Sequence, residues 1–344
     1  MARPPLGPAS LAVDRLWRGD GDNLFGAKVK ANDPSIADVL AAAERIAASV
    51  HRTPIATCAT LDRLTGARLF FKCEHLQKVG AFKARGATNA VFSLSDTEAA
   101  CGVATHSSGN HAAALARAAG LRGIPAHIVM PSSAPPVKRA AVEGYGAIIT
   151  ECEPTLEARE AVLAQVQART GATFIHPFDN PNVIAGQGTA ALELLADIPD
   201  LQTIMAPVGG GGLLSGTAIA VSGIRHNVSV WGAEPSAADD AFRSLRDATL
   251  YPSINPTTIA DGLLTSLSER TFRIIRGLTA GIMTAEETTI IRAMRLLWER
   301  AKLLIEPSAA LPLAVILDHP DTFHGRTIGI ILSGGNVNLD RLPW

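Results

Sequence analysis

The sequence predicts an α/β protein with open parallel sheets flanked by helices, divided into a large and a small lobe. Short apolar stretches of the kind that form strands alternate with helical stretches along most of the chain, and this alternation is typical of parallel sheets covered by helices. The strand candidates span residues 69–71, 103–105, 126–130, 147–150, 173–175, 203–208, 228–233 and 327–332. Four strand–helix units fall between residues 102 and 179, which indicates a smaller lobe inserted into a larger one.

Capping signals mark where several helices begin. Asp33 and Pro34 fit an N-cap and a first helical position, and apolar residues then recur at helical spacing as far as Val50. Two hydroxyl residues stand three positions before a glutamate, the spacing of a capping box: Ser95 before Glu98, and Thr284 before Glu287. We therefore expect an N-terminal arm over residues 1–34, a large domain over 35–101 and 180–344, and a small domain over 102–179.

Composition narrows the class of partner. The chain has 344 residues and 47% hydrophobic content, enough for a large core. Its 31 basic and 32 acidic residues leave no excess of positive charge, which argues against nucleic acid or an anionic membrane surface as a partner. Neither a membrane span nor a secretory signal is readable in the first 26 residues.

The cysteines favour a reducing compartment. Cys58, Cys73, Cys101 and Cys152 are scattered without a C-x-x-C pair, which argues against a structural zinc site and against a disulfide framework. Reduced thiols fit a cytoplasmic protein best.

Lys83 is the first candidate catalytic residue. It lies in the run Gly-Ala-Phe-Lys-Ala-Arg-Gly at residues 80–86, just after a strand candidate. Most lysines are solvated surface charges, and spacing by itself does not reject that interpretation. A lysine that reacts with carbonyl groups must be a neutral amine part of the time, which a desolvating pocket allows. Phe82 would cover one side of such a pocket.

Two loops look like anion sites. Residues 105–111 (Thr-His-Ser-Ser-Gly-Asn-His) join a strand to an alanine-rich helix, so their N–H groups crowd at a helix N-terminus; a plain N-cap explains this loop equally well. His111 alone, with no second ligand at metal spacing, fits a structural role. Residues 209–212 are four consecutive glycines at a strand end, which favours a phosphate cradle over a flexible loop. The run fits neither a dinucleotide fingerprint nor a Walker loop.

One cofactor needs all of these features together. Ser333 ends the last strand candidate with a small hydroxyl residue, and Glu306 with Pro307 begins a helix just before it. A reactive lysine, a carboxylate-sized anion site, a phosphate cradle and a hydroxyl at a strand end match pyridoxal phosphate, which carries an aldehyde, a phosphate and a ring nitrogen.

The same motifs, in the same order, resemble the fold-type II pyridoxal-phosphate enzymes, and most of all their serine racemase and serine/threonine dehydratase branch. The similarity runs from Ser35 to Leu339 and includes residues 184–189 (Ile-Ala-Gly-Gln-Gly-Thr). It implies a two-lobed fold like that of the tryptophan synthase β subunit, with the large domain binding the cofactor and the active site between the lobes. Homodimers are usual among such enzymes.

The resemblance also assigns roles to residues. Lys83 and Ser108 would be catalytic, on opposite faces of the cofactor. The cofactor would be bound by Phe82, Lys83, Asn110, Gly209, Gly210, Gly211, Gly212, Leu213 and Ser333. The substrate carboxylate would be bound by Ser107, Ser108, Gly109, Asn110 and His111. Val79 replaces a threonine found in mammalian serine racemases, which puts nucleotide activation of their kind in doubt.

The implied activity is α,β-elimination from a β-hydroxy amino acid, L-threonine or L-serine, to a 2-oxo acid and ammonia. Serine at position 108, where many threonine dehydratases have alanine, adds serine racemisation as a second reaction. The alternatives are a primary serine racemase, a β-replacement synthase and a 3-hydroxyaspartate dehydratase, in which Lys138 or Arg139 would supply the second cation. A different class is a non-catalytic amino-acid or cofactor sensor, which retention of Lys83 and Ser108 disfavours.

A divalent cation is also implied. Glu234, the Ala238 carbonyl and Asp240 match the metal loop of the family, and oxygen ligands suit Mg²⁺, Ca²⁺ or Mn²⁺. An acidic helix start is an adequate alternative on the sequence alone. We further expect no C-terminal effector domain, because only five residues follow Leu339, and this favours a catabolic or interconverting role.

Overall fold

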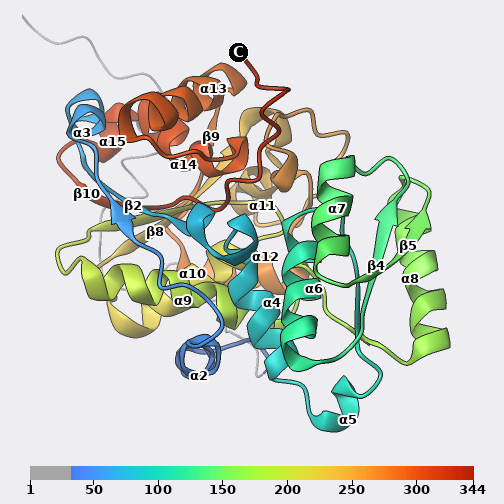
Figure 1. The fold of residues 1–344 in the computed structure, drawn as a ribbon. Coiled ribbons are helices and arrows are strands. Elements are labelled where there is room, and N and C mark those ends of the chain that lie inside the picture. The colour runs from blue at the N-terminus through green and yellow to red at the C-terminus, as the bar shows by residue number, and fades with distance from the viewer. Residues whose placement is uncertain (1–31) are drawn as a thin grey trace, which may run out of the picture.

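The computed structural model describes residues 32–344 and contains two sheets (Figure 1). The larger has the strand order β1-β2-β10-β7-β8-β9, and all neighbouring strands are parallel except β1 and β2. The smaller has the order β5-β4-β3-β6 and is parallel throughout. The predicted α/β class with parallel sheets flanked by helices is confirmed. The predicted N-terminal arm lies outside the described residues apart from its last three.

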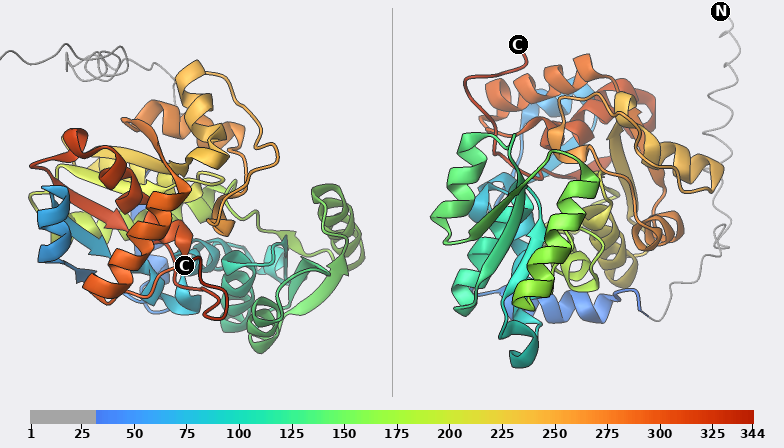
Figure 2. Two further views of the ribbon diagram at one scale, coloured as in Figure 1. Left: turned by 90° about the horizontal axis from the view of Figure 1, so that it is seen from above. Right: turned by 90° about the vertical axis from the view of Figure 1, so that its right-hand side faces the viewer.

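The large sheet consists of β1 (Ile55–Ala56), β2 (Arg68–Lys72), β7 (Thr203–Pro207), β8 (Ser229–Pro235), β9 (Gly281–Ala285) and β10 (Thr327–Ile331). The small sheet consists of β3 (Val103–His106), β4 (Ala126–Pro131), β5 (Ile148–Cys152) and β6 (Thr173–Phe174). Its strands all fall inside the segment expected as the small domain, and they stand with their helices to one side of the larger body (Figure 2). The domain boundaries themselves stay predictions.

The helices before the glycine loop are α2 (Ile36–Ile46), α3 (Ala59–Thr65), η1 (Glu74–Leu76), η2 (Lys78–Gly80), α4 (Lys83–Phe92), α5 (Asp96–Ala99), α6 (Asn110–Arg122), α7 (Pro136–Gly144), α8 (Leu156–Thr170) and α9 (Pro181–Asp197). Those after it are α10 (Gly212–Ile224), η3 (Ser236–Ala238), α11 (Asp240–Asp247), η4 (Asp261–Leu263), α12 (Glu269–Leu278), α13 (Glu287–Leu296), the π-turn η5 (Leu297–Ala301), α14 (Pro307–Asp318) and α15 (Pro320–Phe323). Among residues 32–344, no helix combines the length and apolarity needed to cross a bilayer.

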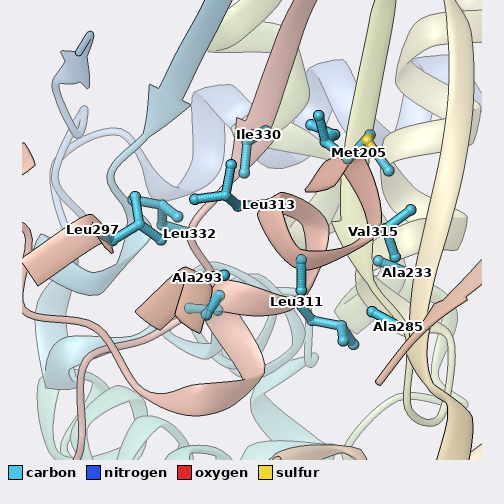
Figure 3. Close-up of a cluster of buried hydrophobic side chains, with 14 of the residues drawn as sticks. Met205, Ala233, Ala285, Ala293, Leu297, Leu311, Leu313, Val315, Ile330 and Leu332 are labelled. Carbon is cyan, nitrogen blue, oxygen red and sulfur yellow. The ribbon is translucent and has the colours of Figure 1, made fainter. Parts of the chain in front are cut away.

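Helix α14 is apolar around most of its circumference because it is packed between the large sheet and other helices. Its Leu311, Leu313 and Val315 lie among sheet side chains such as Met205 and Ile330 (Figure 3). All five are fully buried, and each buried aliphatic side chain stabilises the fold by about 1.5–3 kcal/mol. This core fixes α14 against the large sheet, and the Glu306 N–H donates to the Gly334 carbonyl oxygen at 3.0 Å, which joins the start of α14 to the turn after β10.

Helix α9 is the common support for α4 and α10, against both of which it packs. The helices approach closely at glycines: a Cβ on Gly186 would lie 2.7 Å from the Arg85 carbonyl oxygen, and one on Gly216 would lie 2.3 Å from the Ile184 carbonyl oxygen. Contacts this short exclude any side chain at these positions. The helix that begins with Lys83 and the helix that begins with the glycine loop are therefore fixed to the same element.

Some predicted helix starts are wrong. The first helix begins at Ile36 with Ser35 as N-cap, because Ser35 forms a capping box with Asp38, and it ends at Ile46 rather than Val50. Asp33 instead accepts hydrogen bonds from Arg273.

The two predicted capping boxes have different outcomes. The box of Ser95 with Glu98 is confirmed. Thr284 does not cap a helix, because it lies within β9 beside Glu234 of β8; α13 begins after Glu286.

Candidate active site

Lys83 is the first residue of α4, directly after the bridge that joins Ala81 to Gly334. Its amine donates a hydrogen bond to the Pro177 carbonyl oxygen at 2.7 Å and lies 5.3 Å from the centre of the Phe82 ring. Burial lowers the pKa of Lys83 to about 8. Within residues 32–344 no carboxylate pairs with this amine, so a substantial neutral fraction is available near physiological pH.

The glycine loop joins β7 to α10 and presents free N–H groups. The N–H groups of residues 209–214 donate to no acceptor within the described part of the chain. Gly211 has φ of +82°, a conformation that favours glycine. A Cβ on Gly210 would lie 2.2 Å from the Phe178 ring. Since Phe178 follows the carbonyl that accepts from Lys83, the amine and the loop face the same segment, and the loop forms an anion cradle at a helix N-terminus.

The loop after β3 is a second group of free donors. The N–H groups of Ser108, Asn110 and His111 have no acceptor within residues 32–344, whereas that of Ser107 donates to the Val129 carbonyl oxygen and that of Gly109 to the Ser107 hydroxyl. The buried His111 ring lies 3.1 Å from the Ile175 carbonyl oxygen, in keeping with the structural role expected for it. Burial, and after it the charge of Lys83, lower the pKa of His111.

Ser333 lies directly against the lysine segment. It follows β10, is 3% exposed, and its carbonyl oxygen accepts a hydrogen bond from the Phe82 N–H at 3.0 Å. The structure thus brings Phe82, Lys83, the 108–111 loop, the glycine loop and Ser333 to the ends of neighbouring elements.

Glu306 is a site residue that the sequence indicated only as a helix start. It is the N-cap of α14, but its carboxylate makes no capping bond. It accepts from the Asn110 amide instead, at 3.2 and 3.3 Å. Burial raises the pKa of Glu306 to about 7. The glycines after Ser333 were the one sequence signal for a close neighbour at this point. A Cβ on Gly334 would lie 2.5 Å from a Glu306 carboxylate oxygen.

A buried network of four charged side chains, also missed from the sequence, supports α4 from behind. Arg85 donates to both oxygens of Glu74 at 2.7 and 2.8 Å and to both oxygens of Glu193 at 2.7 and 2.9 Å. Lys72 donates to Glu193 at 2.5 Å and to the Thr53 carbonyl oxygen at 2.6 Å. Two cations and two carboxylates balance, so the network has no net charge.

Glu234 and Asp240, two of the three predicted metal ligands, are both 2% exposed. Glu234 accepts from the N–H groups of Ala241 and Phe242 at 2.9 and 2.7 Å. Both carboxylate oxygens of Asp240 are buried without a hydrogen-bond partner. Burial raises the pKa of Glu234 to about 9 and that of Asp240 to about 6. Ala238 ends η3 just before α11; within residues 32–344 no three His, Cys, Asp or Glu side chains gather as a metal-binding group.

Comparison with known proteins agrees with this geometry. A family model described as "Pyridoxal-phosphate dependent enzyme" matches residues 46–334. The beta-hydroxyaspartate dehydratase of Paracoccus denitrificans (strain Pd 1222) is 51% identical over 311 residues, which are 90% of this chain and 99% of that protein. The crystal structure of serine racemase from Dictyostelium discoideum is 48% identical with a TM-score of 0.86, over 89% of this chain and 99% of the other. The crystal structure of a T.th. threonine deaminase is 46% identical with a TM-score of 0.85, over the same shares.

Proposed function

Because the chain belongs to the fold-type II pyridoxal-phosphate dependent enzymes, in their serine racemase and dehydratase branch, we propose that it is a dehydratase that converts a β-hydroxy amino acid into a 2-oxo acid and ammonia. The observation that carries the proposal is the Lys83 amine, which has no counter-ion among residues 32–344 and lies beside the segment that packs on the glycine loop. The retained Ser108 adds serine racemisation as a second reaction.

The residues fit pyridoxal phosphate. The free N–H groups from Gly209 to Leu213 suit its phosphate, and the Lys83 amine suits its aldehyde. In this assignment Phe82 would lie against the ring, Asn110 would donate to the ring hydroxyl and Ser333 would face the ring nitrogen. When bound, the cofactor supplies an electron-withdrawing ring that stabilises negative charge at the substrate Cα.

Protein groups orient the substrate and move its proton. The free N–H groups of the 108–111 loop bind the substrate carboxylate at the start of α6. The neutral amine of Lys83 removes the Cα proton as general base, which its lowered pKa allows near neutral pH. The hydroxyl of Ser108, which bonds no protein group within residues 32–344, returns or removes a proton on the opposite face in racemisation.

A 3-hydroxyaspartate is the favoured substrate, because Lys138 is a suitable cation for a second carboxylate. Its amine lies 2.7 Å from Asp261, and Asp261 begins η4, whose Gly262 and Leu263 backbone would lie 3.2 and 3.1 Å from a Cβ on Gly209. Lys138 is thus paired with the residue that precedes the segment packed on Gly209. The 51% identical relative carries the name of a beta-hydroxyaspartate dehydratase. L-Threonine and L-serine remain the second candidate substrates.

The experiment that tests this function is incubation of the purified holoenzyme with L-threonine, L-serine, D-serine and the 3-hydroxyaspartates. We expect a 2-oxo acid and ammonia in equal amounts, released fastest from a 3-hydroxyaspartate. Chiral analysis of the remaining serine measures racemisation. A change in the cofactor absorbance with neither ammonia release nor inversion of serine would instead support a non-catalytic sensor.

Lys138→Met is predicted to discriminate between the substrates. Loss of one charge-assisted hydrogen bond to the second carboxylate should raise KM for 3-hydroxyaspartate by about 10- to 100-fold, with KM for L-threonine changed by no more than about threefold. The matched control is Arg139→Met, because the Arg139 guanidinium pairs with Glu151 at 2.7 Å on the small lobe. Equal effects of Lys138→Met on both substrates would contradict the assignment.

Ser108→Ala is predicted to separate the two reactions. Racemisation needs an acid–base group on each face, and removing one should lower its rate by at least about 100-fold. Elimination, which uses Lys83, should retain much of its rate. Both rates are measured on L-serine, by chiral analysis and by ammonia release; an equal loss of both refutes this role of Ser108.

We also propose a divalent cation, Mg²⁺, Ca²⁺ or Mn²⁺, held by Glu234, Asp240 and the Ala238 carbonyl. The donors are hard oxygens, and the unpartnered Asp240 carboxylate is the group that a cation would satisfy. The charge of the cation would stabilise the neighbouring buried carboxylates of Glu234 and Asp240. Chelation should lower both the melting temperature and the activity, and added Mg²⁺ should restore them. No change in either quantity counts against the site.

The assembly and the location are proposals as well: a homodimer in the cytoplasm. Leu76 and Leu304 are 51% and 47% exposed, and with Leu303 they border a surface cavity of about 350 Å³. This apolar surface supports contact with a second copy of the chain. Light scattering on the purified holoenzyme would give the mass of the assembly, and a monomer would remove that part of the proposal.

A further inference from the structure

The side-chain amide of Asn110 is held by two residues distant in sequence. Its nitrogen donates to both carboxylate oxygens of Glu306, and its oxygen accepts from the Asn336 amide at 2.8 Å. The Asn336 nitrogen also donates to the Val79 carbonyl oxygen at 2.7 Å. The network joins the segment before Lys83, the start of α6, the start of α14 and the turn after β10.

The Val79 carbonyl at one end of the network and the Glu306 carboxylate at the other end fix the orientation of the Asn336 and Asn110 amides. A backbone carbonyl only accepts, so the NH₂ group of Asn336 must face Val79, and its second hydrogen goes to Asn110. The oxygen of Asn110 is thereby occupied, which turns its NH₂ group toward Glu306. An ionised carboxylate only accepts, so Glu306 is the matching partner. One hydrogen of the Asn110 NH₂ group, shared between the two Glu306 oxygens at 3.2 and 3.3 Å, accounts for both contacts. The second hydrogen then remains for an acceptor in the site.

Glu306 is built into this position. It is 6% exposed, and Gly334 must be glycine to leave room for its carboxylate. The charges that act on it oppose each other: Lys138 of α7 lowers its pKa, and Asp261 of η4 raises it. The Asn110 amide is its neutral donor, and the Asn336 backbone N–H also lowers its pKa. Burial is the largest effect and brings the pKa to about 7.

We propose that Glu306 is a positioning residue whose carboxylate fixes the Asn110 amide as a hydrogen-bond donor toward the ring hydroxyl of the bound cofactor. This inference rests on the proposed function, since Asn110 is assigned there as the ring contact. Protonated Glu306 has one acceptor oxygen fewer and carries a donor of its own, so it holds the amide less firmly. Cofactor binding should therefore strengthen as Glu306 ionises, through pH 7.

The experiment measures the dissociation constant of pyridoxal phosphate, from visible absorbance, between pH 6 and 8.5. Four proteins are compared: wild type, Glu306→Gln, Asn110→Ala and the double variant. The matched control is Glu287→Gln, a half-buried carboxylate near another helix start that accepts from the Ile259 N–H.

At pH 8, Glu306→Gln should bind the cofactor about tenfold more weakly than wild type, the effect of one charge-assisted hydrogen bond. In this variant the dissociation constant should no longer change with pH around 7, whereas its change with pH due to Lys83 should remain. In the Asn110→Ala background, Glu306→Gln should have no further effect, because Glu306 acts through that amide. Glu287→Gln should bind as wild type does.

Two results would overturn the inference: additive effects of Glu306→Gln and Asn110→Ala, or a Glu306→Gln variant with the wild-type pH profile. If Glu306→Gln does not fold, Asn336→Ala replaces it in the test, because Asn336 is exposed and bonds the oxygen of the Asn110 amide. Asn336→Ala should weaken cofactor binding in wild type and have no further effect in the Asn110→Ala background. Failure of the proposed function looks different, because the protein would then bind the cofactor in a Glu306-dependent way and release no ammonia.

Discussion

Lys83→Met is expected to abolish turnover and at the same time to stabilise the apo protein. In the proposed function the amine is both the covalent attachment point and the general base, and loss of the base alone costs about 10²- to 10⁴-fold in rate. Since the attachment is lost too, we expect a fall of at least about 10⁴-fold in ammonia release.

The gain in stability follows from the lowered pKa. The folded protein holds the Lys83 amine with a pKa of about 8, below the ordinary value for a lysine. At pH 7 the folded protein therefore carries a protonated amine in a buried position that disfavours the charge. The free energy of unfolding rises only as pH increases above 8, where the folded state loses this proton while the unfolded state keeps it. An apolar side chain of similar size removes this penalty, which is on the order of 1–3 kcal/mol. Urea unfolding of the two apo proteins at pH 7 measures the difference.

Lys78→Met is the control, a lysine of η2 five residues earlier in the chain. It should leave both activity and stability near the wild-type values. Mass spectrometry after borohydride reduction should find the cofactor adduct on Lys83 in wild type and none in Lys83→Met. Activity retained within tenfold in Lys83→Met would contradict the assigned role.

Arg85→Met is expected to give the largest loss of stability. Although burial alone would raise the pKa of Glu74, the charge and hydrogen bonds of Arg85 hold it below its ordinary value. Removing the guanidinium leaves Glu74 and Glu193 facing each other in the interior, with only Lys72 to balance them. Breaking a buried pair of this kind costs about 3–5 kcal/mol.

The control for Arg85→Met is Asp200→Asn, which breaks a pair of the same chemical type at the surface. Arg68 and Asp200 are 59% and 56% exposed and lie 2.6 Å apart, and exposed pairs contribute at most about 1 kcal/mol. Urea unfolding at pH 7 compares both variants with wild type. A difference of less than 1 kcal/mol between them would mean that the network does not hold α4.

The local chemistry of the site was largely predictable from the sequence. The reactive lysine, the four glycines and the 105–111 loop are each contained in a few consecutive residues, and their position at strand ends follows from the strand–helix alternation. Two strands were not predicted from the sequence. β1 has only two residues and pairs antiparallel at the sheet edge, and β9 has no clear strand pattern of its own and is recognised by its pairing with β8. The first helix start was wrong because two capping signals overlap and Ser35 forms the better one.

The partners of these groups were not predictable. The Pro177 carbonyl lies 94 positions from Lys83, Glu193 lies 108 from Arg85, and Glu306 lies 196 from Asn110. A glutamate before a proline looks the same in sequence whether its carboxylate caps the helix or turns to another residue. The Glu306 carboxylate turns away because the fold brings the Asn110 amide within reach and leaves space at Gly334.

The sequence alone determined which groups are candidates to bind the cofactor, since N–H cradles and a lysine before a helix need only local backbone geometry. The tertiary structure decided which charges are buried and what faces them. Desolvation and pairing depend on neighbours that only chain folding brings together, so the lowered pKa of Lys83, the raised pKa of Glu306 and the neutral network around Arg85 appear only in the folded molecule.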